Sequence, residues 1–270
     1  MKTPSFYDTV TAAIRDFTLH GYDDKERLAY WTERLKKAAS ENMVSDVVLK
    51  ATMQKNLSRI YDSLVLRGGI LTKHKGVERF TLEHVKPKLR AELDRRIVAA
   101  ANLIKLNREE AIQNTLLRFS GWATSIPAGG SKTVNKTEEK QKVRKSLRQL
   151  PFEERRVLID QGHKFVSSLN SILAKDANAI AAEWHSHWQQ LNYNYRRDHK
   201  ERDKKVYAIR GNWAIKAGLM HANENGYTDQ ITEPGEEVFC RCYYRYIYNL
   251  RDLPDDMLTE KGAIALKEVA

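Results

Sequence analysis

Apolar residues recur every three or four positions through most of the first half of the chain. The spacing is clear in Leu28, Trp31, Leu35 and Ala38. This period places apolar side chains along one face of a helix, and few stretches of residues 6–126 alternate as strands do. We therefore expect a helical bundle, including a long core-facing helix that opens at Pro87, because proline is well tolerated in the first turn of a helix.

Two breaks interrupt the helical pattern, at residues 20–24 and 67–69. Both contain glycine, which takes left-handed turns readily, and the first contains an aspartate placed to cap the next helix. The stretch at residues 77–82 also resembles a short strand, so a winged helix over residues 45–82 is an alternative to a plain bundle. That alternative lacks a second wing and a defined recognition helix.

The composition changes near the middle of the chain. Residues 125–137 are small and polar and include proline and glycine, which is typical of a linker. We expect a basic helical domain at residues 1–126, a linker or mobile loop at 127–150, and a helix followed by a small α+β module at 151–270.

The last region begins with helical spacing and changes character after Trp188. We expect its helix to start at Pro151 and to continue to Trp188. Residues 205–210 and 238–248 are predicted to be strands, because their side chains alternate in polarity. The predicted fold class is therefore a mainly α N-terminal helical region with a small C-terminal α+β module.

The overall composition is that of a soluble globular protein. Of the 270 residues, 41% are hydrophobic and 30% are charged, and no run of about 18 apolar residues predicts a membrane span. The apolar core of a secretory signal is missing from the N-terminus. Two cysteines are too few for a disulfide scaffold and fit a reducing compartment, so we expect the chain to be cytosolic when it is made.

Positive charge is concentrated in the first part of the chain. Residues 1–150 contain 29 Lys and Arg against 17 Asp and Glu, whereas residues 151–270 contain 17 against 18. A basic excess favours contact with nucleic acid, because each neutralised phosphate releases counterions. A solvated basic helix surface is the competing interpretation, since the Lys and Arg are scattered and no DNA-reading motif accompanies them.

Cys240 and Cys242, the two cysteines of the chain, are candidate zinc ligands, because zinc prefers thiolate and imidazole. The histidines that could complete such a site are His185, His187, His199 and His221. The one-residue spacing is unfavourable, because side chains two apart on a strand lie about 6–7 Å apart along the chain, and only a turn or bulge at Arg241 would bring the sulfurs together. Two buried thiols packed beside aromatic residues, with no cofactor, are the favoured interpretation.

His199 lies in a strongly polar segment just before a predicted strand. Asp203, four residues later, is placed to pair with it. Neither a nucleophile elbow nor a phosphate-binding loop accompanies the two residues. We interpret them as part of a buried hydrogen-bonded structural cluster, with acid–base catalysis as the alternative.

The C-terminal third also carries a pattern of residues that is found in a known protein family. Members carry a histidine, an Asp-Gly turn into a strand, a proline-containing loop, and Asn-Cys-Arg-Cys entering the last strand. The matching residues here are His199, Asp203, Pro234, Cys240, Arg241 and Cys242. On these residues, and mainly over residues 180–250, the chain resembles the phage Mu F-like minor head proteins of the phage head morphogenesis family. Lys204 stands where the family usually has glycine, and Phe239 where it has asparagine.

The resemblance implies a minor capsid protein that acts in head morphogenesis of a tailed bacteriophage. Such a protein would associate with the portal protein during prohead assembly in the host cytoplasm, and would then stay in the virion, in the capsid interior or at the portal. Other capsid proteins, and packaged DNA through residues 1–150, would be further partners. We expect no enzymatic activity; the alternative is a metal-dependent nuclease or toxin-like enzyme that uses His199 and Asp203.

Overall fold

The computed structural model describes residues 5–268 except 42, 44 and 126–135, and these residues form a mainly helical structure with one small sheet. The expected fold class is therefore confirmed. Two compact units are formed, unit 1 from Met1–Thr52 and Ala99–Val157 and unit 2 from Met53–Val98 and Leu158–Ala270. Three helices run through both units: α3 (Asp46–Tyr61), α4 (Arg79–Ser125) and α5 (Lys136–Asp176).

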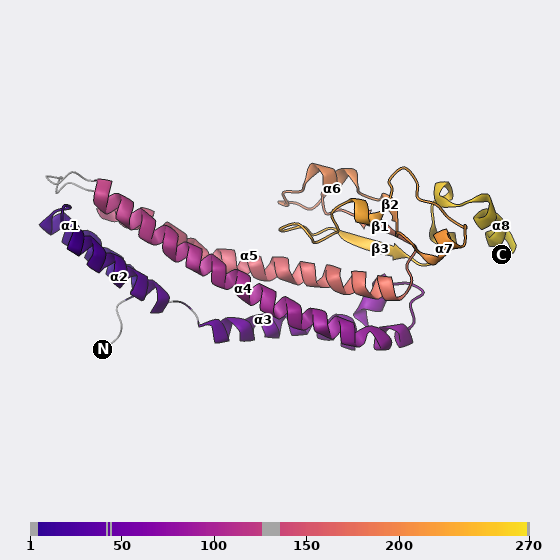
Figure 1. Ribbon diagram of the computed structural model, residues 1–270, viewed down its shortest axis with the longest axis horizontal. Helices are drawn as coiled ribbons and strands as arrows, with labels where there is room; N and C mark the ends of the chain where they lie inside the picture. Colours follow the sequence, from indigo (N-terminus) through magenta and orange to yellow (C-terminus); the bar gives the residue numbers. More distant parts are fainter. Residues whose placement is uncertain (1–4, 42, 44, 126–135, 269–270) are drawn as a thin grey trace. The chain divides into compact units, whose positions relative to one another are not determined.

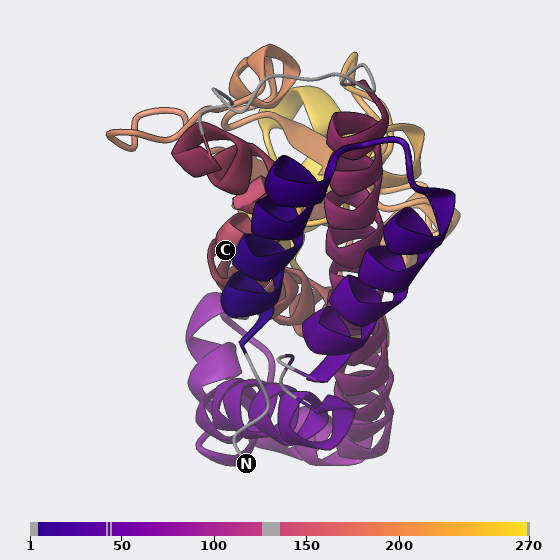
Figure 2. The same cartoon turned by 90° about the vertical axis from the view of Figure 1, so that its left-hand side faces the viewer.

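In unit 1, α1 (Phe6–His20) and α2 (Lys25–Glu41) pack against the C-terminal part of α4 (Figure 2). The core of this unit is rich in aromatic rings. Phe17 of α1 meets Phe119 and Trp122 of α4 edge to face, with ring centroids 5.7 and 6.1 Å apart. Such pairs add specific geometry to the burial of apolar area, so they fix how the helices of the unit face one another.

The break expected at residues 20–24 is the turn between α1 and α2. Gly21 has a φ of 95°, a conformation that glycine adopts without a steric cost. The Asp24 carboxylate accepts a hydrogen bond of 3.0 Å from the backbone N–H of Arg27, and so caps the start of α2. Both features predicted for this break are confirmed.

Unit 2 begins with the end of α3, a π-helical turn at Asp62–Leu66 and a 3-10 helix at Gly69–Lys73. Here the prediction that Pro87 opens a helix is wrong, because α4 already begins at Arg79. Leu82 and Val85, in the turns before the proline, are buried in the core of the unit, and this burial outweighs the hydrogen bond that proline cannot make. The strand of the winged-helix alternative is also wrong, since residues 79–82 are helical.

Residues 136–150, which we expected to be a linker or mobile loop, form the first part of α5. Val143 and Leu150 are buried there, so the segment has an apolar face that packing can stabilise. The remainder of the expected loop, residues 127–135, lies outside the described residues. Pro151 lies inside the helix and does not start it.

The helix predicted to continue to Trp188 ends instead at Asp176, and β1 (Ala181–His185) follows. Asn178 has a φ of 58°, which stops the helix because a left-handed residue cannot continue it. The run of alanines around residue 180 fits either structure, and pairing with two other strands decides the outcome.

Three antiparallel strands form a sheet in the order β2-β1-β3, with β2 at Val206–Ala208 and β3 at Tyr243–Ile247. Trp184 of β1 lies opposite Tyr244 of β3. Within unit 2 the sheet runs along the C-terminal part of α5 (Figure 1). Short elements surround it: α6 (Arg197–Glu201), α7 (Trp213–Lys216), 3-10 helices at Thr228–Gln230, Leu250–Asp252 and Asp255–Met257, and α8 (Glu260–Glu268).

The sequence expectation of no membrane span agrees with the structure. Among the described residues, no helix combines the length and the apolar character that a bilayer crossing requires.

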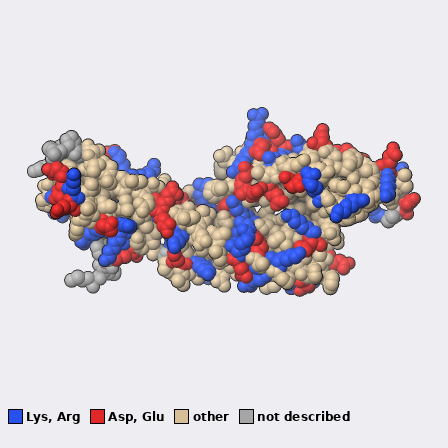
Figure 3. Space-filling model, viewed as in Figure 1, with Lys and Arg blue, Asp and Glu red and all other residues tan. Residues whose placement is uncertain are grey.

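Basic and acidic side chains are interspersed over the face shown in Figure 3.

Candidate functional site

His199 is held in α6, a single short helix that follows the irregular segment after β1. Its side chain is only 2% exposed. The ring packs edge-on against Trp184 of β1, with centroids 5.1 Å apart. A histidine so deeply buried needs partners for both ring nitrogens, because an unsatisfied buried polar atom is costly.

Cys240 and Cys242 supply partners for one of those nitrogens. The two Sγ atoms lie 3.7 and 3.5 Å from Nδ1 of His199. One ligand atom from each of the three residues lies within 4.8 Å of the other two, and all three residues are buried. We call these three residues the His-Cys-Cys cluster.

The expected strand over residues 238–248 is therefore too long, because β3 begins only at Tyr243. Phe239 has a φ of 60°, and residues 238–239 form a turn. This turn precedes both cysteines, and residues 240–242 belong to neither a turn nor a strand. The turn or bulge expected at Arg241 is not present, yet both sulfurs lie near Nδ1 of His199 because the segment between the turn and β3 is not a regular strand.

Backbone and carboxylate groups surround the cluster. Nε2 of His199 lies 2.6 Å from Oε2 of Glu237, and the backbone N–H of Gly235 donates to Sγ of Cys240 at 3.4 Å. A hydrogen bond with Cys242 lowers the pKa of Cys240 to about 6, although burial opposes this. The same hydrogen bond, together with burial, raises the pKa of Cys242. One thiolate and one thiol sharing a proton account for this pair of opposite shifts.

Asp203 does not pair with His199 as we expected. Its carboxylate accepts hydrogen bonds from the backbone N–H of Ser186 at 2.8 Å and from Nε1 of Trp188 at 3.0 Å. It thereby fixes the turn after β1, while Glu237 takes the place beside His199. Asp203 and His199 therefore do not form the pair that the sequence suggested.

The other motif residues also have structural contacts. Pro234 is buried, and its carbonyl oxygen accepts a hydrogen bond from the hydroxyl of Ser167 on α5. The backbone N–H of Arg241 donates to the hydroxyl of Tyr193 at 3.3 Å, and its guanidinium lies over that ring at 5.4 Å. These contacts attach the loop before β3 to α5 and to the segment after β1.

The remaining candidate histidines do not join the His-Cys-Cys cluster among the described residues. His185 instead stacks on Tyr243, with ring centroids 4.9 Å apart. His187 lines a neighbouring pocket, and His221 is an exposed residue whose backbone N–H donates to Met257.

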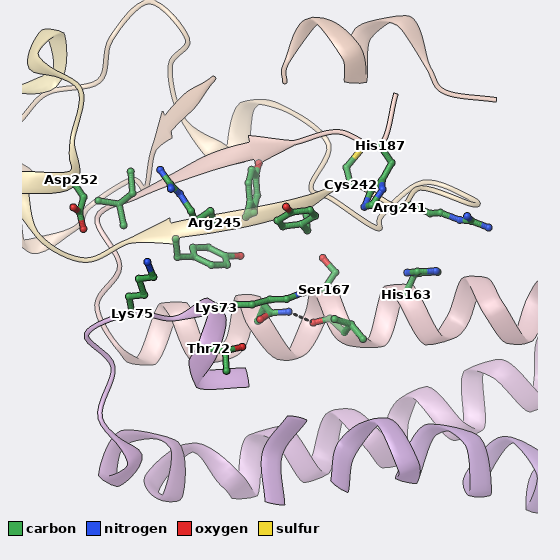
Figure 4. Close-up of a pocket in the computed structure, with 16 residues that line it drawn as sticks. Thr72, Lys73, Lys75, His163, Ser167, His187, Arg241, Cys242, Arg245 and Asp252 are labelled. Atoms are coloured by element: carbon green, nitrogen blue, oxygen red, sulfur yellow. Dashed lines mark hydrogen bonds between the residues drawn. The ribbon is translucent and has the colours of Figure 1, made fainter. Parts of the chain in front are cut away.

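A pocket of about 630 Å³ adjoins the cluster, and Cys242 forms part of its wall. Figure 4 shows His163 and Ser167 on α5 facing Arg241, Cys242 and Arg245 of the β3 segment across it. Its charged lining residues are mostly basic: Lys73, Lys75, Arg241 and Arg245, with Asp252 the acidic one. Burial lowers the pKa of His163 and of His187, and the charge of Arg241 lowers both further. This positive lining suits an anionic ligand.

Two parts of this site could not be found from sequence. Nothing in the pattern distinguishes Glu237, which lies beside Nε2 of His199, from Glu236 next to it. The pocket draws residues from three distant segments, around Lys73, His163 and Arg241. Only the positive charge of those residues was visible beforehand.

Comparison of the chain with family models, with characterised proteins and with solved structures gives no match.

Proposed function

We propose that this protein is a minor capsid protein of a tailed bacteriophage, which binds the portal protein during prohead assembly. The observation that carries the proposal concerns the two positions at which the chain departs from the phage Mu F-like motif. Lys204 and Phe239 replace the family's glycine and asparagine, and both have a positive φ, of 63° and 60°. Glycine and asparagine are the residues that tolerate this conformation best, so the backbone here is the one that the motif would require.

The matched residues also act together, which supports the proposal further. His199 and the Cys-Arg-Cys segment are about forty positions apart and meet in one buried cluster. Asp203 fixes the turn after β1, and Pro234 attaches its loop to α5. A motif whose members stabilise one small module fits an assembly protein, because such a protein needs a rigid interaction surface and no reaction centre.

Packaged DNA is the second partner in this proposal, contacted through the basic residues 1–150. The chain would be made in the host cytoplasm and would then remain in the virion. Contact with phosphates needs no base-reading motif, because counterion release alone drives binding that does not depend on sequence.

The test is quantitative mass spectrometry of purified proheads and virions from the phage that encodes the chain, together with co-expression of the chain and that phage's portal protein. We expect a few copies of the chain per portal and co-elution with the portal ring. A chain absent from proheads and virions that also fails to bind the portal would overturn the proposal. DNA cleavage by the purified protein, lost in His199→Ala, would replace it with the nuclease alternative.

A further inference from the structure

We propose that His199, Cys240 and Cys242 bind a zinc ion that cross-links α6 to the loop before β3. The inference does not depend on the proposed function, because it rests on the geometry of the His-Cys-Cys cluster alone.

The distances within the cluster fit a tetrahedral zinc site. With Zn–S near 2.3 Å and Zn–N near 2.05 Å, tetrahedral angles place a sulfur and a nitrogen ligand about 3.6 Å apart. The two Sγ atoms lie 3.7 and 3.5 Å from Nδ1 of His199. The side chains are therefore already spaced as ligands would be.

Glu237 favours the tautomer of His199 that zinc binding requires. Oε2 of its carboxylate lies 2.6 Å from Nε2 of His199, and this charge contact favours a proton on that nitrogen although the two atoms are not aligned as a hydrogen bond. Nδ1 then carries a lone pair that faces the two sulfurs. A carboxylate behind a ligating histidine is the usual arrangement at zinc sites, because it fixes both the tautomer and the ring orientation.

Both Sγ atoms lie within 3.7 Å of Nδ1 of His199, although a neutral imidazole with its proton on Nε2 offers only one acceptor there. One thiol can donate to Nδ1 and the other to its neighbouring sulfur, so a hydrogen-bonded pair of thiols is the alternative, and metal content distinguishes the two. A zinc ion satisfies all three atoms at once. The backbone N–H of Gly235, which donates to Cys240, would stabilise the thiolate that such a site contains.

The soft ligand set selects zinc over magnesium or calcium, which prefer oxygen. Among the described residues, no fourth His, Cys, Asp or Glu atom completes the group. A water molecule is therefore the fourth ligand in this proposal. The ion would join two segments that lack extended regular structure and so stabilise the module, although three protein ligands and a water form the open pattern of a catalytic zinc and not the closed one of a structural zinc.

The first experiment measures zinc by elemental mass spectrometry on the full-length protein, purified under reducing conditions from zinc-supplemented cells. We expect about one zinc per chain, and zinc lost from Cys240→Ser/Cys242→Ser. The control is His221→Ala, an exposed histidine of the same module, which should keep its zinc.

Cobalt provides a second measurement that does not depend on a variant that folds. Co²⁺ added to reduced, metal-free wild-type protein should give thiolate-to-cobalt charge-transfer absorption and the visible bands of a tetrahedral site, and Zn²⁺ should remove both. Wild-type protein with free thiols that contains no zinc above background and gives no cobalt spectrum would overturn the proposal, as would equal zinc in the double cysteine variant.

A matched pair of variants tests the role of Glu237 as a positioning residue. Glu237→Gln should weaken zinc affinity about 10- to 100-fold, as is typical when the carboxylate behind a ligating histidine is removed. Glu236→Gln changes the neighbouring exposed carboxylate, which bonds the backbone N–H of Glu233, and should leave the affinity unchanged. Equal effects of the two substitutions would contradict the assigned role.

Discussion

Lys204 and Phe239 share a left-handed backbone conformation, one in the turn after α6 and the other in the turn before Cys240. Each turn holds one side of the His-Cys-Cys cluster, since His199 precedes the first and Cys240 follows the second. Neither residue is suited to its conformation, because a Cβ atom in the left-handed region approaches the following carbonyl oxygen. Substitutions that relieve this backbone strain should therefore change the free energy of unfolding.

Lys204→Gly should raise the free energy of unfolding by about 0.5–1 kcal/mol, because relief of the left-handed strain exceeds the entropy that glycine adds to the unfolded chain. Lys205→Gly is the matched control: it is also exposed, but its φ is not positive. We expect it to destabilise by about 0.5–1 kcal/mol. Urea denaturation of both variants gives the comparison, and a stabilising effect in Lys205→Gly would contradict the argument.

At the second turn, two substitutions separate the effect of losing the ring from the effect of backbone strain. Phe239→Asn and Phe239→Ala both remove the ring, which is 37% exposed. Only asparagine tolerates the left-handed region well, so the asparagine variant should be the more stable by about 0.5–1 kcal/mol. Thermal or urea unfolding measures the difference, and two equally stable variants would show that the turn changes its conformation when the ring is lost.

The buried imidazole of His74 should make the protein lose stability in acid. Asn170 donates to the carbonyl of Val166 through its amide nitrogen, so its oxygen, 2.8 Å from Nε2 of His74, accepts the proton of that ring nitrogen. The hydroxyl of Tyr248 lies against Nδ1, and the ring is 1% exposed. Burial lowers the pKa of His74, and the charge of Lys73 lowers it further, although the hydrogen bond to Asn170 opposes this.

Because the folded-state pKa lies below the unfolded value, the unfolded chain binds the proton first as the pH falls. The contribution of His74 is fully present above pH ~6.5 and is lost as the pH falls below that value toward the folded-state pKa. His74→Asn keeps a polar, uncharged side chain and should flatten this part of the stability curve. Urea denaturation between pH 7.5 and 5 tests this, and an unchanged slope in the variant would contradict it.

Contact with DNA predicts a steep dependence on salt. Binding of a DNA duplex should weaken as salt rises, with a logarithmic slope of about −0.9 for each phosphate contacted. Lys145→Glu/Arg148→Glu alters two exposed residues of α5 and should weaken binding and reduce that slope. The control, Lys216→Glu/Lys267→Glu, makes the same charge change at exposed positions of the last region. Equal losses in the two variants would assign the effect to net charge and not to residues 1–150.

The sequence by itself determined the elements whose side chains repeat with one period over a long stretch. The helices of the first half follow from apolar positions spaced by three and four, and the turn at residues 20–24 follows from Gly21 and Asp24, because these signals are local. The fold class could be predicted for the same reason. The side-chain types of the candidate site were also visible, since Cys240 and Cys242 are the two cysteines of the chain and His199 lies in a strongly polar segment.

Tertiary structure decided the conformation of segments whose local signals fit more than one structure. The run of alanines around residue 180 fits a helix or a strand, and pairing with β2 and β3 makes it β1. Pro151 lies inside α5 because buried residues on both sides of it support one continuous helix. The left-handed φ of Phe239, at a residue that rarely adopts it, ends the predicted strand before Cys240, so β3 begins only at Tyr243. Such a conformation depends on contacts between distant segments, which no pattern of neighbouring residues contains.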